Sequence, residues 1–271
     1  MKLGLVQMLV TADKEKNIRM AERHIASCAA YGADIVVLPE MFCCPLSPKY
    51  YAALAEERGG PAWRRMAEAA ARRGVWLVAG SLPEREGERL YNTAFVFDPA
   101  GREAARHRKL HMFDLNLPGQ ETRESDIFTP GAAPTLFDTP WRRCGLCVCF
   151  DLRFPELALR MALGGAELIV APAVFSAVTG AAHWETLLRQ RAVDNQLFMA
   201  AVSAARGEKG FVSYAHSMVT GPWGDILYEA GTEETAAVVS IDFEEVRAVR
   251  EKLPLLPARR PELYSEVERD E

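Results

Sequence analysis

The sequence predicts an α/β protein built from stacked layers of strands and helices. Short apolar runs of strand length alternate with segments of helical spacing along nearly the whole chain. Of the 271 residues, 49% are hydrophobic and 25% are charged, the balance of a globular chain that can bury a large core. No repeat, low-complexity segment or linker interrupts the alternation. We therefore expect one domain over residues 1–271, ending in an extended C-terminal arm over about residues 254–271.

The first elements form a strand-helix unit followed by a buried strand. Residues 3–9 predict a strand, and apolar residues recur at helical spacing over residues 18–29. Residues 35–38 are continuously apolar, as in a strand covered on both faces, and Pro39 ends the strand. Glu40 is therefore expected just past the C-terminal end of a strand.

The next segment predicts a helix, a strand and a hairpin. Residues 61–73 have helical spacing with proline in the first turn, and residues 75–79 predict the strand that follows. Residues 90–97 and 103–107 flank an Asp-Pro-Ala-Gly turn and predict two antiparallel strands. Lys109 then lies just beyond the second of these strands.

The middle of the chain combines an irregular segment with a strand-to-helix turn. Residues 110–134 contain two Pro-Gly pairs and several charges, and loops of this length tend to be functional, so we expect an active-site loop. Residues 144–148 predict a short strand, and the nearly uncharged residues 155–163 predict a buried helix. Cys149 falls between them. Further elements are expected at residues 168–171, 182–195, 198–203, 217–220, 226–228 and 236–241.

Composition and charge narrow the classes of partner. The formal net charge of -5 gives no basic field for a phosphate backbone, so nucleic acid is excluded as the main ligand. The first residues lack the apolar run and cleavage site of a signal peptide, and no stretch of about 18 uncharged apolar residues suits a membrane span. We expect a soluble cytoplasmic protein with no membrane partner, whose six cysteines are mostly reduced thiols.

Position singles out Cys149 among the cysteines as a candidate nucleophile. It stands at a sharp strand-to-helix turn, the kind of turn that exposes a nucleophile. The positive dipole end of the following helix favours thiolate, so we expect a depressed pKa for the Cys149 thiol. Most cysteines merely fill space in a core. That reading suits Cys28 on its helix face and Cys147, one layer deeper than Cys149, whereas Cys43 and Cys44 are expected in a loop.

A metal site built from Cys144, Cys147 and Cys149 is another reading of the same segment. Strand residues alternate between the two faces of a sheet, so Cys144 points away from the other two cysteines. Three thiolates from one strand cannot converge on one ion in that geometry. We expect no metal and no other cofactor.

A cysteine hydrolase also needs a group that moves protons. The best-placed ionisable residues past strand ends are Glu40 and Lys109 rather than a histidine, which points to a carboxylate and an ammonium group. Isolated Glu and Lys residues are usually solvated surface groups, so spacing alone leaves both readings open.

Three segments resemble the signatures of the nitrilase superfamily of carbon-nitrogen hydrolases. They are Val37-Leu38-Pro39-Glu40, Arg108-Lys109-Leu110-His111-Met112-Phe113 and Gly145-Leu146-Cys147-Val148-Cys149-Phe150-Asp151. The resemblance implies a catalytic triad of Glu40, Lys109 and Cys149. It also implies a four-layer αββα sandwich, and a homodimer or higher homo-oligomer that pairs through the helices beside the nucleophile and through the C-terminal arm.

Within the superfamily the chain is most similar to the omega-amidase branch, through residues 179–184, 191–196 and 259–264. The resemblance implies a thiol-dependent amidase whose partner is a small-molecule amide. Its substrates would be small dicarboxylic acid monoamides, such as 2-oxoglutaramate or 2-oxosuccinamate, which yield the acid and ammonia. A second family carboxylate matches Glu124, with Glu121 as the alternative position.

The implied mechanism is acyl transfer through a cysteine thioester. Glu40 acts as the base when Cys149 attacks the amide carbonyl. Lys109 and the backbone N–H of Phe150 hold the developing oxyanion. Glu40 then protonates the departing ammonia and activates the water that cleaves the thioester, while Glu124 orients Lys109 or the substrate.

Residues beside the triad have tentative roles. Phe42, Phe175 and Thr179 are expected on loops near the mouth of the site, where they would bind substrate. The start of the helix that follows Thr179 is one candidate for holding a substrate carboxylate, and ordinary helix capping is the alternative. Asp151 and Arg153 are expected to fix the nucleophile turn through a buried ion pair.

Two positions depart from the family pattern. Phe150 stands where a tyrosine is often found, so no tyrosine hydroxyl can act there. Ala215 precedes His216 and Ser217 at a position where we expect glycine.

Other functions stay open. The triad does not identify the leaving group, so hydrolysis of deaminated glutathione, an N-carbamoyl compound or a nitrile is the nearest alternative. A redox protein that uses Cys144 and Cys147 is the alternative from a different class, although that pair lies within a strand rather than opening a helix. The complete triad argues against a binding module with an inactive site.

Overall fold

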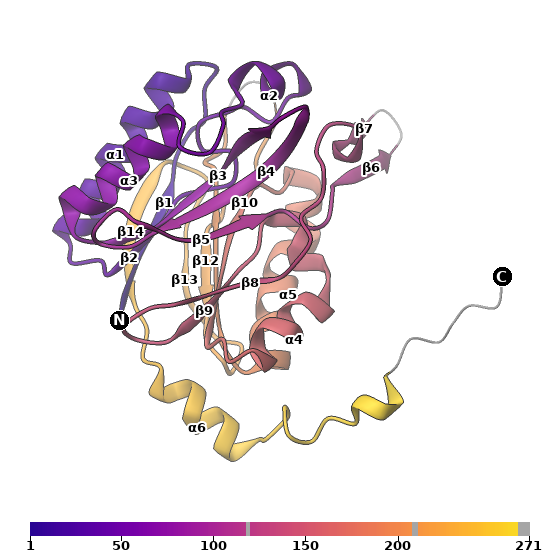
Figure 1. Cartoon of the computed structure of the whole chain (residues 1–271). Coiled ribbons are helices and arrows are strands. Elements are labelled where there is room, and N and C mark those ends of the chain that lie inside the picture. The colour runs from indigo at the N-terminus through magenta and orange to yellow at the C-terminus, as the bar shows by residue number, and fades with distance from the viewer. Residues whose placement is uncertain (118–119, 208–210, 265–271) are drawn as a thin grey trace.

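Two six-stranded sheets lie face to face, and helices cover the outer surface of each sheet (Figure 1). The structure is a computed structural model that describes residues 1–117, 120–207 and 211–264. The layers follow the order helix, sheet, sheet, helix, so the predicted four-layer αββα sandwich is confirmed.

The first sheet has the strand order β14-β1-β2-β3-β4-β5. Strands β1, β2 and β3 run parallel, and the remaining neighbours pair antiparallel. Helices α1 and α3 pack against each other and against this sheet. The bounds are β1 Lys2–Gln7, β2 Ile35–Val37, β3 Trp76–Glu86, β4 Arg89–Phe97, β5 Glu103–Arg108, β14 Thr235–Ser240, α1 Lys14–Ala30 and α3 Pro61–Arg73.

The second sheet has the strand order β13-β12-β11-β10-β9-β8. Strands β9, β10 and β11 run parallel, and the outer strands pair antiparallel. Helices α4 and α5 contact each other and strands of this sheet. The bounds are β8 Thr135–Asp138, β9 Arg143–Leu146, β10 Leu168–Ala173, β11 Phe198–Ser203, β12 Met218–Thr220, β13 Ile226–Glu229, α4 Pro155–Leu163 and α5 Ala177–Asn195.

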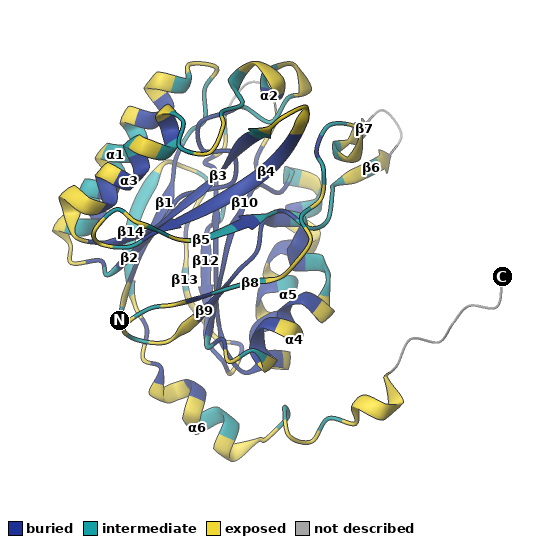
Figure 2. Cartoon of the chain, viewed as in Figure 1, coloured by how far each residue is buried: buried dark blue, intermediate teal, exposed yellow. Residues whose placement is uncertain are grey.

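An apolar core fills the space between the two sheets, and the central strands are buried (Figure 2). Leu5 and Val37 of the first sheet belong to the same buried cluster as Val170 of the second. Trp76 of β3 stacks on Phe137 of β8, with ring centroids 6.4 Å apart. A second buried cluster joins the first sheet to α1 and α3. The two sheets therefore form a rigid base from which side chains at the strand ends can be held in place.

Several smaller elements complete the chain. The segment expected to be an active-site loop contains a hairpin and a short 3-10 turn, and α2, β8 and α6 were not predicted. Most residues of helix α6 are charged and only Val246 is buried, so its apolar signal is weak. The bounds are α2 Pro48–Leu54, β6 Asp114–Leu117, β7 Gln120–Arg123, η1 Glu124–Asp126, η2 Cys149–Arg153, α6 Glu244–Lys252 and η3 Pro261–Leu263.

Two predictions about the helices of the second sheet need correction. Helix α4 has the expected bounds, but only one of its faces is buried, and Leu163 on the other face is 49% exposed. Helix α5 begins at Ala177 rather than at residue 182, because the Ser176 hydroxyl caps it by accepting a hydrogen bond from the Thr179 N–H. Thr179 therefore lies in the first turn of a helix and not on a loop.

The C-terminal arm follows α6. Its described part, residues 254–264, extends away from the sandwich in Figure 1 and ends in η3. Residues 265–271 of the predicted arm lie outside the described residues. Within the described part of the chain, no helix has both the length and the apolar character that a membrane span requires.

Candidate active site

The chain reverses direction sharply after β2, and this reversal carries Glu40. Met41 has a φ of 51°, in the left-handed region that non-glycine residues rarely occupy. Its N–H donates to the Ser81 hydroxyl at 3.0 Å. Gly80 lies directly beneath, and a Cβ there would stand 2.1 Å from the Pro39 carbonyl oxygen. The close approach of β3 therefore fixes the backbone on which Glu40 stands.

A second reversal, after β9, carries Cys149. Its φ is 48°, so the predicted sharp turn at the nucleophile is confirmed. The element that follows it is η2, one 3-10 turn, and α4 begins only at Pro155. Asp151 closes the turn by accepting a hydrogen bond from the Val148 N–H at 3.0 Å.

Asp151 does not pair with Arg153, so that prediction is wrong. Its fully buried carboxylate accepts from His107 Nε2 at 3.0 Å and from His111 Nδ1 at 2.7 Å, and it also accepts from the backbone N–H of His111 at 3.0 Å. Burial alone would raise the pKa of Asp151, but the hydrogen bonds from the two histidines hold that pKa well below its ordinary value. One ionised carboxylate thus ties the nucleophile turn to the segment around Lys109.

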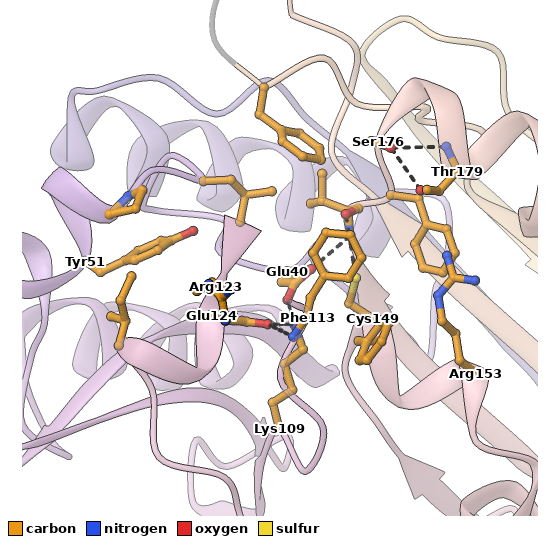
Figure 3. A pocket seen from close by; sticks show the side chains of 17 residues that line it. Glu40, Tyr51, Lys109, Phe113, Arg123, Glu124, Cys149, Arg153, Ser176 and Thr179 are labelled. Carbon is orange, nitrogen blue, oxygen red and sulfur yellow. Dashed lines mark hydrogen bonds and ion pairs between the residues drawn. The ribbon is translucent and has the colours of Figure 1, made fainter. Parts of the chain in front are cut away.

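The predicted triad side chains converge with Glu124 at the edge where β2, β5 and β9 end (Figure 3). Lys109 Nζ lies 3.1 Å from Glu40 Oε1 and 2.7 Å from Glu124 Oε2. The other oxygen of Glu40 accepts from the Val174 N–H at 3.0 Å, and the Cys149 thiol donates to the Val174 carbonyl at 3.6 Å. The carboxylate and the thiol are therefore held side by side by one residue of the strand end after β10.

Glu124 occupies the position expected of a second carboxylate. Besides Lys109, its side chain accepts from the Phe113 N–H at 2.7 Å, which anchors it in the segment between β5 and β6. Glu121, the alternative position, belongs to β7, and its side chain lies outside the described part of the structure.

Asn92 was missed by sequence reasoning. It is buried in β4, and its Nδ2 donates to Glu40 at 2.8 Å and to Glu124 at 3.4 Å. Its backbone carbonyl accepts from the Lys109 N–H at 2.8 Å. Asn92 and Lys109 thus bridge the same pair of carboxylates from two adjacent strands. An asparagine within a strand pattern gives no sequence signal for this role.

Burial strongly affects the protonation of Cys149, Glu40 and Lys109. It raises the pKa of the Cys149 thiol well above its ordinary value, and the Glu40 carboxylate raises it further. The predicted depressed pKa is therefore wrong, because one 3-10 turn cannot offset desolvation and a neighbouring negative charge. Burial also raises the pKa of Glu40, against the opposing charge of Lys109. Burial would lower the pKa of Lys109, but Glu40 and Glu124 outweigh it and keep this ammonium group charged.

A cavity of about 190 Å³ opens beside the triad. Phe150, Phe175 and Thr179 line it, as expected for residues near the substrate. The Phe150 ring contacts the Phe113 ring, with centroids 5.2 Å apart, and forms an apolar wall. Phe42 is fully buried in the cluster beneath α1 and α3 and does not line this cavity, so its predicted role in substrate binding is wrong. The reversed backbone at Met41 directs Phe42 into the core.

Arg153 also lines the cavity, which sequence reasoning did not foresee. Its guanidinium lies 4.9 Å from the centroid of the Phe175 ring and 3.2 Å from His183 Nδ1. Among the described residues it has no carboxylate partner. The cavity therefore contains a cation that no acidic side chain among the described residues neutralises.

The six cysteines are free thiols and all are buried. Burial raises the pKa of Cys144 to about 12 and raises that of Cys147 as well, and neither thiol lines the cavity. Nothing in this arrangement favours the redox alternative. Within the described ranges, no group of three or more His, Cys, Asp or Glu side chains is arranged to hold a metal ion.

A thiol, a carboxylate and an ammonium group at the strand ends of an αββα sandwich define a class: thiol-dependent hydrolases that act on carbon-nitrogen bonds. The family model described as carbon-nitrogen hydrolase matches residues 2–251. The chain belongs to this family, and its structural neighbours are members of the nitrilase superfamily.

Individual relatives agree with this membership. Omega-amidase NIT2 of Bos taurus is 43% identical, with 98% of this chain and 97% of the relative covered. The crystal structure of the C. elegans NitFhit protein matches with a TM-score of 0.91 and 34% identity, over 97% of this chain and 66% of that one. A mutant amidase from Nesterenkonia sp. AN1 matches with a TM-score of 0.79 and 28% identity, over 97% of this chain and 95% of that one. Its structure shows covalent addition of the acetamide moiety of fluoroacetamide at the active site cysteine.

Proposed function

We propose that this enzyme is an omega-amidase, which hydrolyses the terminal amide of small dicarboxylic acid monoamides to the acid and ammonia. 2-Oxoglutaramate and 2-oxosuccinamate are the expected substrates. Membership of the family and the 43% identity to a protein named omega-amidase support the amidase chemistry. The observation that carries the substrate class is Arg153, the cation that lines the cavity without a carboxylate partner among the described residues.

Arg153 suits the free carboxylate of such a substrate. A guanidinium group can donate two parallel hydrogen bonds to a carboxylate. The Phe150 and Phe175 rings, with centroids 5.7 and 4.9 Å from the guanidinium, hold its position and exclude water from one side. The hydroxyl of Thr179 lies on the same side of the cavity in Figure 3 and can donate a further hydrogen bond.

Acylation follows from the arrangement of the triad. The Cys149 thiol is neutral at rest, so its proton must move to Glu40 as sulfur attacks the amide carbonyl. The raised pKa of Glu40 makes this carboxylate a stronger base than an exposed one. Lys109 keeps its charge and stabilises the developing oxyanion. Phe150 contributes its backbone N–H, because the first N–H groups of η2 have no acceptor within that turn.

Deacylation uses the same groups. Glu40 returns its proton to the nitrogen as ammonia leaves, and it then removes a proton from the water that attacks the thioester. Glu124 accepts a hydrogen bond from Lys109, and Asn92 donates to both Glu40 and Glu124. These contacts hold Lys109 and Glu40 in place through both steps.

Ammonia release from 2-oxoglutaramate, succinamate, glutamine and a simple nitrile tests the substrate class. We expect turnover of both monoamides, and failure on both would contradict the proposal. Replacement of Arg153 by Met should lower kcat/KM for succinamate by about 30- to 100-fold, the effect of losing hydrogen bonds to a charged group, with little change for propionamide. Arg160→Met on the exposed face of α4 is the matched control and should change neither.

We also propose a homodimer located in the cytoplasm. The outward face of α4 leaves Leu163 49% exposed, and a groove lined by Leu159 of α4, Leu255 and Tyr264 runs beside the arm. A second copy would cover this apolar surface. Sedimentation at micromolar concentration should give a dimer, and a monomer under those conditions would count against this assembly.

A further inference from the structure

One end of the cavity is apolar and lies around Tyr51. Leu46 and Ile127 line the cavity and pack against the same small buried cluster as Tyr51. Pro48, in the first turn of α2, completes this end, which we call the Tyr51 chamber. These four side chains carry no charge, and the charged Arg123 and Glu124 line the cavity between Tyr51 and Lys109 (Figure 3).

The hydroxyl of Tyr51 is the polar group of this chamber. The side chain is only 8% exposed, and its ring packs on Phe128 with centroids 4.9 Å apart. Figure 3 shows the hydroxyl directed into the cavity, and no described residue forms a hydrogen bond with it. Buried hydroxyls normally have a partner. Because this hydroxyl faces the cavity, it can bond to a water molecule in the free enzyme and to a ligand atom that displaces the water.

The orientation of the bound substrate determines which of its groups faces the Tyr51 chamber. This step rests on the proposed function, in which the acid carboxylate pairs with Arg153. Figure 3 shows Tyr51 and Arg153 on opposite sides of Glu40 and Cys149. The acyl chain and the nitrogen extend in opposite directions from an amide carbonyl carbon. With the acyl chain toward Arg153, the nitrogen faces Glu40 and the Tyr51 chamber beyond it.

Ammonia alone makes poor use of this space. It has no carbon atom to contact Leu46 or Ile127, and it needs only the room of a single water molecule. We propose that the Tyr51 chamber is a leaving-group subsite, through which the enzyme also hydrolyses secondary amides of the same acids. The preferred nitrogen substituent is small and aliphatic, and it ends in a hydrogen-bonding group that reaches the Tyr51 hydroxyl.

The chemistry is the same as for the primary amide. The Cys149 sulfur bonds to the carbonyl carbon while Glu40 accepts the thiol proton. The carbon-nitrogen bond then breaks, the electron pair stays on nitrogen, and Glu40 returns the proton so that a primary amine leaves in place of ammonia. Water cleaves the thioester and restores the thiol. Burial raises the pKa of Tyr51, and Glu124 and Glu40 raise it further, so its hydroxyl stays a neutral donor throughout.

Four amides of one acid test the subsite: succinamate, N-methylsuccinamate, N-propylsuccinamate and N-(2-hydroxyethyl)succinamate. Release of succinate gives kcat/KM for each. We expect the N-methyl compound to fall within about tenfold of succinamate. The hydroxyethyl compound has the same length as the propyl compound, and we expect it to be favoured by about 3- to 10-fold, the effect of one hydrogen bond.

Two variants connect these ratios to the chamber. Leu46→Trp fills the space and should lower the ratio of secondary to primary amide hydrolysis by about tenfold or more, an effect of overpacking on the larger substrates. Tyr51→Phe should remove the advantage of the hydroxyethyl compound over the propyl compound. Tyr50→Phe is the matched control, because Tyr50 precedes Tyr51 in α2 but does not line the cavity. It should leave every ratio unchanged.

The outcomes separate this inference from the proposed function. Turnover of succinamate without turnover of any N-substituted compound would overturn the subsite and leave the omega-amidase assignment intact. Turnover of propionamide in preference to succinamate would overturn the omega-amidase assignment. In that case N-methylpropionamide replaces the succinyl series, and a ratio that Leu46→Trp does not change would overturn the subsite as well.

Discussion

The turn that carries Glu40 and the turn that carries Cys149 occupy matching places in the two facing sheets. Each follows a parallel strand, β2 or β9, and each contains a non-glycine residue with positive φ, Met41 at 51° or Cys149 at 48°. Their supports differ. The Glu40 turn rests mainly on the backbone of β3, where Gly80 leaves no room for a side chain, and the Ser81 hydroxyl adds one hydrogen bond to it. The Cys149 turn rests on one buried carboxylate, that of Asp151.

This difference teaches where each half of the site is vulnerable. A backbone support can be broken only by adding atoms or by forcing a different φ. A side-chain support can be broken by removing one charge, because buried hydrogen-bond donors are then left without an acceptor. The backbone of the Glu40 turn should therefore tolerate conservative side-chain changes better than the backbone of the Cys149 turn does.

Among the substitutions that compare the two turns, Asp151→Asn should cause the largest loss of stability and activity. The amide cannot accept all the hydrogen bonds that the carboxylate receives, and a buried charge network is broken. We expect a loss of about 3 kcal/mol in the free energy of unfolding and at least about a 100-fold loss of kcat, measured by denaturant titration and ammonia release. Asp138→Asn, which breaks a surface pair with Arg143, is the control and should stay close to wild type.

The effect of Asp151→Asn on the free energy of unfolding should depend on pH. The pKa of Asp151 lies below its ordinary value in the folded protein, so its ionised form stabilises the fold at neutral pH. That contribution is fully present above the unfolded pKa of about 4 and is lost as the pH falls below it. The difference in unfolding free energy between wild type and Asp151→Asn should therefore shrink below pH of about 4. A difference that stays constant into acid would contradict the assignment.

Gly80→Ala tests the other turn. The added Cβ meets the Pro39 carbonyl oxygen, and the φ of 57° disfavours any side chain. We expect a loss of about 2 to 4 kcal/mol in the free energy of unfolding, from strain and overpacking together. Gly74→Ala has a similar φ of 63° but open space around it, so it should lose only about 1 kcal/mol. Equal losses would show that the contact beneath Glu40 does not matter.

Asn92→Leu tests how the protein controls proton transfer by Glu40. It removes a hydrogen bond from Glu40 while keeping the size of the side chain. A lost donor destabilises the ionised carboxylate, so the pKa of Glu40 should rise and the acidic limb of the kcat/KM profile should move to higher pH. We expect kcat to fall by about tenfold. If the variant yields less folded protein but the acidic limb of its kcat/KM profile does not move, Asn92 has only a structural role.

Ala215→Gly should have the smallest effect. Ala215 has a φ of 64°, which explains why the family pattern favours glycine there. Glycine relieves the left-handed strain of about 1 kcal/mol but gains entropy in the unfolded chain. We expect a net stabilisation below about 1 kcal/mol in thermal unfolding, with activity unchanged. A destabilised variant would show that the methyl group contributes packing that outweighs its strain.

The sequence predicts the parts of this account that depend on strand ends and apolar periods. The α/β layers, the turn at Cys149 and the positions of Glu40 and Lys109 past strand ends follow from where apolar runs stop. The two-sheet sandwich and the meeting of Glu40 with Lys109 followed from the family resemblance. Glu124 was predicted from the family pattern alone. It lies beside Lys109, as that pattern required.

The parts that were missed depend on burial and on contacts between distant segments. Asp151 was paired with Arg153 because they are neighbours in sequence, but its true partners, His107 and His111, come from the end of β5. Phe42 was placed at the mouth of the site because it follows Glu40, but the positive φ at Met41 turns the chain inward. The raised pKa of the thiol reflects desolvation, which no residue pattern measures.

Trapping the acyl-enzyme tests the central claim most directly. Wild-type enzyme is mixed with succinamate, quenched in acid within one turnover and digested, and the peptides are analysed by mass spectrometry. We expect a succinyl group on Cys149, with Cys144 and Cys147 unmodified, and neither adduct nor turnover in Cys149→Ala. An adduct on Cys144 or Cys147, or continued ammonia release by Cys149→Ala, would contradict it.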